Sequence, residues 1–226
     1  MKSELTNINN GEIISSKKLT STAWHIKLKV PFYMELDMDR NPGYIIPLLS
    51  GNEEQEDALL IRSTLWNYDV VRNTVEIIIY ARKSNEAWLE NLSPGKTIRY
   101  LDPEEVIIQG LNTENYYLIG NTDAQAFFYQ FNRSLPFTHT VNSFIYSKQT
   151  GEFFPDIDGS YPLNYNIIYP FSPERVLHLF IRDFTKENEN FVILLHGERE
   201  VNSLFLSYFK KEWGATDNQI KISNFH

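Results

Sequence analysis

The segment from Tyr116 to Phe128, YYLIGNTDAQAFF, constrains the fold of this chain most strongly. Its apolar start predicts a buried strand, Gly120 predicts a sharp turn, and a helix is expected to open at Asn121 or Thr122. The same order of strand, turn and helix recurs in FVILLHGEREVNSLFLSYF, residues 191–209. Units of this kind usually hold a ligand where their strands end, so the pattern predicts an α/β sheet with a binding site at that edge.

The second half of the chain alternates predicted strands and helices. FVILL is a continuous apolar run, typical of strands buried on both faces of a parallel sheet. Ser172 and Pro173 mark the start of a helix, and Gly214 marks the end of the next one. The stretch from Ser147 to Phe171 is expected to be a long surface loop. We predict strands in YYLIG, THTVNSFIYS, FVILL and QIKIS, and helices from Asp123 to Asn132, in SPERVLHLFIRDF and up to Trp213, which together indicate a doubly wound domain.

Short strands separated by turn residues fill the first half, from about Lys17 to Ile108. Trp24, Ile26, Leu28 and Val30 alternate with polar or small residues, which predicts a half-buried strand. Six or so strands with one small helix predict a compact antiparallel barrel. The other strands are expected in GYIIPLL, ALLIRSTLWNY, TVEIIIYAR, KTIRYLD and EEVIIQ, and the helix in SNEAWLENL.

The composition of the 226 residues excludes several classes of protein. The chain has no Cys, which excludes disulfides, thiolate catalysis and cysteine metal sites. Its formal net charge of −8 argues against a broad nucleic-acid surface. The start of the chain lacks the apolar core of a secretory signal, and no apolar run reaches membrane-spanning length. We therefore expect a cytoplasmic protein, a monomer, that binds neither nucleic acid nor membrane.

Four segments together resemble one known family: IRSTLWNYD, AWLENLSPGKT, YYLIGNTDAQA, and LLHGE followed by a helix and KISNF. They are similar to an Arg-x-Tyr-Thr motif, a Trp followed by a Pro-Gly-Asp turn, a strand ending in Gly-Asp-Glu-Thr-Ala, and a last strand with Gly-Glu. That family is the siderophore-interacting proteins, FAD-dependent ferric-siderophore reductases within the ferredoxin-reductase group. The resemblance implies a six-stranded Greek-key barrel of the FAD-binding type over residues 1–110. It also implies a doubly wound, NAD(P)-binding-like domain of the siderophore-interacting type over residues 111–226.

The first segment implies flavin contacts from Arg62, Ser63, Thr64 and Leu65. Thr64 fits the hydroxyl position of the motif, and Arg62 is the cation for the pyrophosphate. Aligning the motif through Thr64 and Asp69 puts Ser63 in the place of the tyrosine and moves Arg62 by one residue. In a strand, one residue changes the face. Two interpretations of Arg62 stay open, a phosphate contact and an ordinary solvent-facing strand residue.

The second segment implies flavin contacts from Tyr80, Arg82, Lys83, Ser84 and Trp88. The family's His-Gly and Gly-Pro-Ala-Ser are absent here, so a backbone cradle for phosphate is lost. The charged and hydroxyl side chains are expected to replace it, ahead of a short helix whose N-terminus favours anions. The alternative is a solvated loop. Trp88 is expected to pack between domains or to contact the flavin.

The third segment implies flavin contacts from Asn121 and Thr122. Their alternative role, compatible with the first, is to cap the helix that follows. The Gly-x-Gly-x-x-Gly fingerprint is absent, so tight NAD binding of the standard kind is not predicted. His196 ends a predicted strand with Glu198 nearby; it is either a proton donor or, as the favoured interpretation, a hydrogen-bonded structural residue.

The resemblance implies that NAD(P)H or a reduced ferredoxin delivers electrons through FAD to a bound ferric siderophore, which releases its iron as the ferrous ion. Ferric siderophores are often anionic, so a basic rim is expected to receive them, with Lys96 and Arg99 as substrate contacts beside Arg82 and Lys83. A second hypothesis is a flavin-free or differently liganded binding protein with the same fold. A third is a general flavin or ferredoxin reductase unconnected with iron.

Overall fold

The computed structural model describes residues 8–31, 43–50, 59–106 and 113–222. The chain divides into two compact units, Met1–Ile107 and Ile108–His226, called the barrel unit and the sheet unit below. Each has its own apolar core. The predicted domain boundary at residues 110 and 111 lies outside the described residues and stays a prediction. Within the described ranges, no helix is long and apolar enough to span a membrane.

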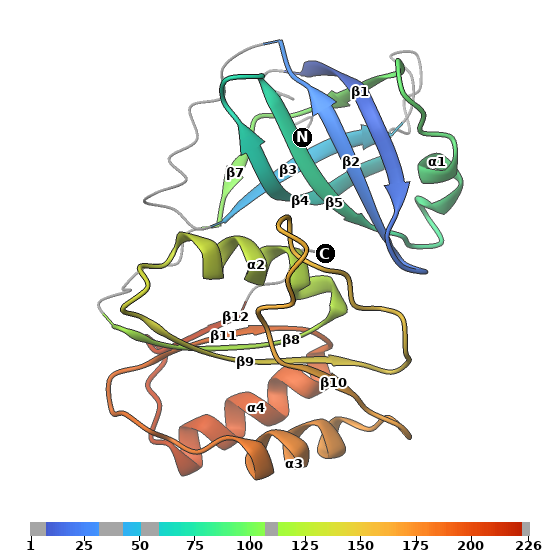
Figure 1. Cartoon of the computed structure of the whole chain (residues 1–226). Helices are drawn as coiled ribbons and strands as arrows, with labels where there is room; N and C mark the ends of the chain where they lie inside the picture. Colours follow the sequence, from blue (N-terminus) through green and yellow to red (C-terminus); the bar gives the residue numbers. More distant parts are fainter. Residues whose placement is uncertain (1–7, 32–42, 51–58, 107–112, 223–226) are drawn as a thin grey trace, which may run out of the picture. The chain divides into compact units, whose positions relative to one another are not determined.

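The barrel unit is a closed antiparallel barrel of six strands (Figure 1). The strands follow the order β1-β2-β5-β4-β3-β6 around the barrel, and β6 pairs again with β1, which is a Greek-key arrangement. The predicted fold class of this unit is confirmed. Its elements are β1 (Asn9–Lys18), β2 (Ala23–Lys29), β3 (Tyr44–Ser50), β4 (Leu59–Asp69), β5 (Thr74–Tyr80), α1 (Glu86–Glu90), β6 (Thr97–Tyr100) and β7 (Glu104–Glu105), which pairs with β3.

Strand β1 lies almost wholly before the strands predicted from sequence, which begin at about Lys17. Its residues are mostly polar, and only Gly11 and Ile13 are buried. An irregularity between Ile13 and Ser15 in the pairing with β2 also breaks the alternation. A strand with so few buried side chains has little period-2 signal, so its pairing with β2 and β6 defines it instead.

A charged network holds three strands together on the outer face of the barrel. Glu76 of β5 accepts from Lys27 of β2 at 3.0 Å and from Asn67 of β4 at 3.3 Å. Its other carboxylate oxygen lies 2.8 Å from Nε2 of His25. The adjacent His25 imidazole, and then the Lys27 ammonium, lowers the pKa of Glu76 to about 2, against the opposing effect of burial.

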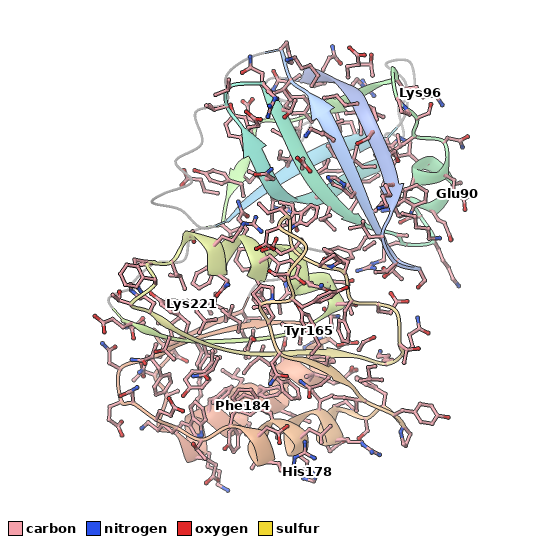
Figure 2. All side chains as sticks on the ribbon, viewed as in Figure 1. Glu90, Lys96, Tyr165, His178, Phe184 and Lys221 are labelled. Atoms are coloured by element: carbon pink, nitrogen blue, oxygen red, sulfur yellow. The ribbon has the colours of Figure 1, made fainter. Side chains whose placement is uncertain are left out.

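We expect Glu76→Gln to destabilise the barrel unit by about 2 kcal/mol at pH 7. The pKa of Glu76 is depressed in the folded state, so the stabilisation is fully present above the ordinary value of 4.5 and is lost as the pH falls toward 2. The difference between wild type and variant should therefore shrink over that window. Urea denaturation at several pH values measures it. Glu90→Gln, the same charge change on an exposed residue (Figure 2), is the control, and a variant difference that does not depend on pH would contradict the assignment.

The sheet unit is a five-stranded parallel sheet with helices on both faces. The strand order is β10-β9-β8-β11-β12, with α2 on one face and α3 and α4 on the other (Figure 1). The predicted doubly wound sheet is confirmed. Its elements are β8 (Asn115–Asn121), the 3₁₀ turn η1 (Thr122–Ala124), α2 (Gln125–Ser134), β9 (Thr140–Ser147), β10 (Tyr165–Ile167), α3 (Pro173–Asp183), β11 (Val192–His196), α4 (Arg199–Glu212) and β12 (Ile220–Ile222).

Local signals place α3 and most of the loop before it correctly. The Ser172 side chain accepts a hydrogen bond from the Arg175 backbone N–H at 3.2 Å, so the predicted N-cap is confirmed. The loop predicted from Ser147 to Phe171 differs in containing the three-residue strand β10, which pairs with the end of β9. Arg133 of α2 forms an ion pair with the buried Asp156, which fixes the rest of this loop on α2.

Candidate functional site

Three predicted flavin contacts share one outer wall of the barrel. Ile61, Leu65, Val75, Ile77 and Ile79 belong to the barrel core. Side chains alternate along a strand, so the positions between them on β4 and β5 face outward. Those positions include Arg62, Thr64 and Tyr80, and Thr64 lies opposite Ile78 across the two strands. Arg62 therefore lies on the same outward face as Thr64, and its predicted contact with a phosphate stays a prediction.

Ser63 and Leu65 face the inside of the barrel. The Ser63 side chain is buried, and its hydroxyl donates to the Ile46 carbonyl oxygen at 2.6 Å. Leu65 has no exposed surface and belongs to the barrel core. The structure thus does not bring these two side chains together with Arg62 and Thr64. Arg62 itself forms an ion pair with Glu104 of β7, so an anionic ligand would compete with that carboxylate.

The loop after β5 presents Arg82, Lys83 and Ser84 as exposed side chains. Its shape is fixed by Asn85, which was not among the predicted site residues. The Arg82 backbone N–H donates to Asn85 Oδ1 at 2.6 Å, and Asn85 Nδ2 donates to the Tyr80 carbonyl at 3.3 Å. The backbone N–H of Arg82 is therefore engaged inside the loop. Any phosphate contact here would rest mainly on side chains.

Trp88, in the five-residue helix α1, packs against the apolar core of the barrel unit. Trp88 is therefore a packing residue within the barrel unit. Its predicted packing between domains stays a prediction. The predicted role in contacting a flavin stays a prediction.

The predicted basic rim is divided between different parts of the barrel. Arg82 and Lys83 follow β5 near the turn between β1 and β2. Arg99 lies opposite Asn10, near the other end of β1. At the rise of an extended strand these positions are about 26 Å apart along β1. Lys96 (Figure 2) lies between them, and its ammonium donates to a carbonyl oxygen at the end of α1 at 2.6 Å. Lys96 and Arg99 do not gather with Arg82 and Lys83.

The outer wall meets part of what a flavin dinucleotide requires. A pyrophosphate needs cations, and Arg62, Arg82 and Lys83 supply them. A flavin ring needs hydrogen-bond donors and a flat contact. Thr64 and Tyr80 have the residue types for these roles, although Thr64 is only 4% exposed. The residues present fit FAD through side chains rather than through a backbone cradle. No group of His, Cys, Asp and Glu able to hold a metal ion occurs in the parts of the chain that the structure describes.

The turn after β8 is shaped by close packing. A Cβ on Gly120 would lie 2.5 Å from the His196 carbonyl oxygen and 2.6 Å from Ala124 Cβ. Asn121 caps the turn, because its side chain accepts from the Asp123 backbone N–H at 3.1 Å. Asn121 thus caps the 3₁₀ turn η1, whereas α2 itself begins after Ala124 without a side-chain cap. Asn121 and Thr122 are partly exposed at this edge, and their predicted contact with a flavin stays a prediction.

A second polar network joins the carboxyl ends of β9 and β11. Tyr146 donates to Glu198 Oε2 at 2.7 Å, and Lys148 lies 2.9 Å from Glu198 Oε1. The Lys148 ammonium also lies 4.3 Å from the centroid of the Phe171 ring, which stacks on Tyr146. A Cβ on Gly197 would lie 2.4 Å from the Tyr146 hydroxyl, so this glycine allows the tyrosine to reach Glu198.

The network fixes two protonation states. Burial, and then the charge of Glu198, raises the pKa of Tyr146 well above its usual value, so Tyr146 stays a hydrogen-bond donor. Burial acts to raise the pKa of Glu198, but the hydrogen bonds from Tyr146 and Lys148 hold it below its usual range. Glu198 is therefore a carboxylate at neutral pH.

Sequence reasoning missed Tyr146, Lys148 and Phe171. A usable signal for Tyr146 was its place near the end of a predicted strand, where doubly wound sheets bind ligands. His196 is buried in the sheet, which agrees with the structural interpretation. His178 is exposed on α3 and points away from the sheet (Figure 2), so it takes no part in this edge.

No protein-family model and no curated protein matches this sequence. Solved structures match its fold along nearly the whole chain. The siderophore-interacting protein of Acinetobacter baumannii has a TM-score of 0.78 and 14% identity, covering 97% of this chain and 90% of its own. The ferredoxin reductase in carbazole 1,9a-dioxygenase has a TM-score of 0.74 and 16% identity, covering 97% and 70%. The flavohemoglobin from Malassezia yamatoensis, with bound FAD and heme, has a TM-score of 0.71 and 12% identity, covering 97% and 60%.

Sequence identities this low show only that the fold is shared, so the function has to be argued from the site. The neighbours share a barrel and a doubly wound sheet with this chain in the predicted order. The chain therefore has the fold of these siderophore-interacting and ferredoxin-reductase structures.

Proposed function

We propose that this chain is a flavin-dependent reductase of ferric siderophores. The observation that carries the proposal is the shared outer wall of Arg62, Thr64 and Tyr80, with Arg82 two residues after the end of β5. Two neighbours support it: a siderophore-interacting protein similar over almost the whole chain, and a flavohemoglobin of similar fold that contains FAD. The donor would be NAD(P)H or a reduced ferredoxin.

The barrel residues would bind and orient the cofactor and the substrate. The electron-carrying chemistry would come from bound FAD, and the protein would supply binding and orientation. Arg62 and Arg82 would pair with the pyrophosphate, Arg62 exchanging Glu104 for the phosphate. Thr64 would donate a hydrogen bond to the flavin, and the Tyr80 ring would give it a flat contact. Lys83, exposed beside Arg82, would attract an anionic ferric chelate.

The first test is the affinity for FAD. Arg62→Ala and Arg82→Ala should each weaken FAD binding about tenfold, since charged hydrogen bonds to phosphate are removed. Flavin fluorescence titration measures this. Arg72→Ala is the matched control, because Arg72 is exposed in the turn between β4 and β5, at the other end of both strands. Equal losses in all three variants would place the cofactor elsewhere.

The second part of the proposal concerns the substrate. With FAD, a reduced donor and a ferric siderophore under anaerobic conditions, a ferrous-specific chelator should develop colour faster than without protein. Turnover of simple flavin acceptors without any ferric-siderophore reduction would instead favour a general flavin or ferredoxin reductase.

Two observations favour a second candidate, a binding protein that keeps the fold without flavin. Asn85 engages the Arg82 backbone N–H, and the Ser63 hydroxyl is used inside the barrel. Both reduce the polar groups left for a flavin. A colourless protein that gives no calorimetric heat with FAD would decide for this candidate.

A further inference from the structure

The network of Tyr146, Lys148 and Glu198 lies where a doubly wound sheet binds its ligand. The chain leaves β8 toward β9 and β10 and then crosses to β11 on the other side of β8. The strand order therefore reverses between β8 and β11, and ligands bind outside the carboxyl ends of the strands at such a reversal. Tyr146 and Lys148 come from the end of β9, and Glu198 follows β11.

The ion pair crosses the end of β8. Strand β8 pairs with β9 on one side and with β11 on the other, so the latter two lie about 10 Å apart. Lys148 and Glu198 meet at 2.9 Å only by reaching across the carboxyl end of β8, beside Asn121. Both side chains keep solvent access, Lys148 at 56% and Glu198 at 28%. A ligand entering at the reversal would meet this pair.

Lys148 and Glu198 have opposite effects on the preference for a nucleotide with a 2′-phosphate. In doubly wound dinucleotide sites, a carboxylate after the second strand binds the adenosine ribose hydroxyls, whereas a cation there accepts a 2′-phosphate. Lys148 directly follows the second strand of the unit and taken alone favours the phosphate. Glu198 reverses this preference, because it holds the ammonium and cancels its charge. Asp123, whose charge also acts on Tyr146, adds to the negative potential.

We propose that Glu198 is a specificity-determining residue that makes this edge accept a nicotinamide dinucleotide without a 2′-phosphate and disfavour the 2′-phosphorylated form. The inference rests on the proposed reductase function and names its electron donor. Tyr146 and Gly197 are positioning residues, since the Tyr146 hydroxyl fixes the carboxylate and the missing Cβ of Gly197 leaves room for that hydroxyl. Binding is expected to be weak, because Gly120, near the end of β8, is the single glycine from the start of β8 to the end of α2.

The test is calorimetric titration of the full chain with NAD⁺ and with NADP⁺, which measures binding without turnover. In the wild type, the Kd for NADP⁺ should exceed that for NAD⁺ about tenfold. Glu198→Gln frees Lys148 and should reduce this ratio about tenfold. Adding Lys148→Ala to Glu198→Gln should restore a preference for NAD⁺. Glu200→Gln is the matched control, the same charge change two residues further along, on an exposed side chain, and should leave the ratio unchanged.

Three results would overturn the inference: a wild type that prefers NADP⁺, equal shifts in Glu198→Gln and Glu200→Gln, or no binding of either nucleotide. FAD binding and ferric-siderophore reduction by another donor, measured on the same samples, distinguish the two failures. If those activities persist, the proposed function stands and only the donor assignment falls. If no FAD binds while the nucleotide ratio behaves as stated, the proposed function falls and the nucleotide site remains.

Discussion

Gly120→Ala is expected to destabilise the sheet unit by about 3 kcal/mol, at the upper end of what overpacking usually costs. The new Cβ would lie 2.5 Å from the His196 carbonyl oxygen and 2.6 Å from Ala124 Cβ, and the Phe128 ring would be 3.0 Å away. The two nearest atoms belong to the backbone or are bonded directly to it. They cannot rotate away, so β8 would have to separate from β11 and from the start of α2.

Hydrogen exchange of the β8 and β11 amides measures this effect within the sheet unit alone. Gly151→Ala is the control: Gly151 has a positive φ of 79° and nothing within 4 Å of an added Cβ. It should cost about 1 kcal/mol through backbone strain without overpacking. Similar losses of protection in both variants would mean that close packing at Gly120 does not hold the two strands together.

The same glycine shows what the sequence could predict. An apolar strand, one glycine and a capping residue indicate a turn from strand to helix. In the structure β8 runs through Gly120 to Asn121, and the turn η1 follows directly. The Ser172 cap was predictable for the same reason, since a cap depends on residues three apart. Local chemistry of this kind needs no knowledge of the rest of the fold.

The other features of the candidate site depend on strand pairing between segments that are far apart in the sequence. The face of Arg62 depends on which neighbours enter the barrel core, and only the closed barrel decides that. Arg82 and Lys96 are close in sequence, yet α1 and the turn after it carry the chain away from the β5 loop. Lys148 and Glu198 are fifty residues apart in sequence, and only the parallel order of β9, β8 and β11 brings them together. Spacing along the chain carried no signal for that pair.

Phe180→Ala is expected to give the largest loss of stability, about 4 kcal/mol. Phe180 is 1% exposed on α3, and its ring centroid lies 5.2 Å from that of Phe205 and 5.5 Å from that of Phe209, both on α4. It lies 5.8 Å from Phe144 of β9. Removing the ring would leave a cavity shared by two helices and the sheet, and these aromatic neighbours have little freedom to fill it.

Phe137→Ala is the control for this cavity, because Phe137 is 99% exposed and should change stability by less than about 0.5 kcal/mol. Denaturant unfolding followed by tryptophan fluorescence reports the comparison, since Trp213, one of the four Trp residues, belongs to the same aromatic core. Phe144 of β9 lies two residues before Tyr146, and Phe205 and Phe209 belong to the helix that begins directly after Glu198. The cavity should therefore also loosen the bond between Tyr146 and Glu198. A Phe180→Ala variant that kept the wild-type preference for NAD⁺ over NADP⁺ would show that the hydrogen bond between Tyr146 and Glu198 does not depend on the aromatic packing around Phe180.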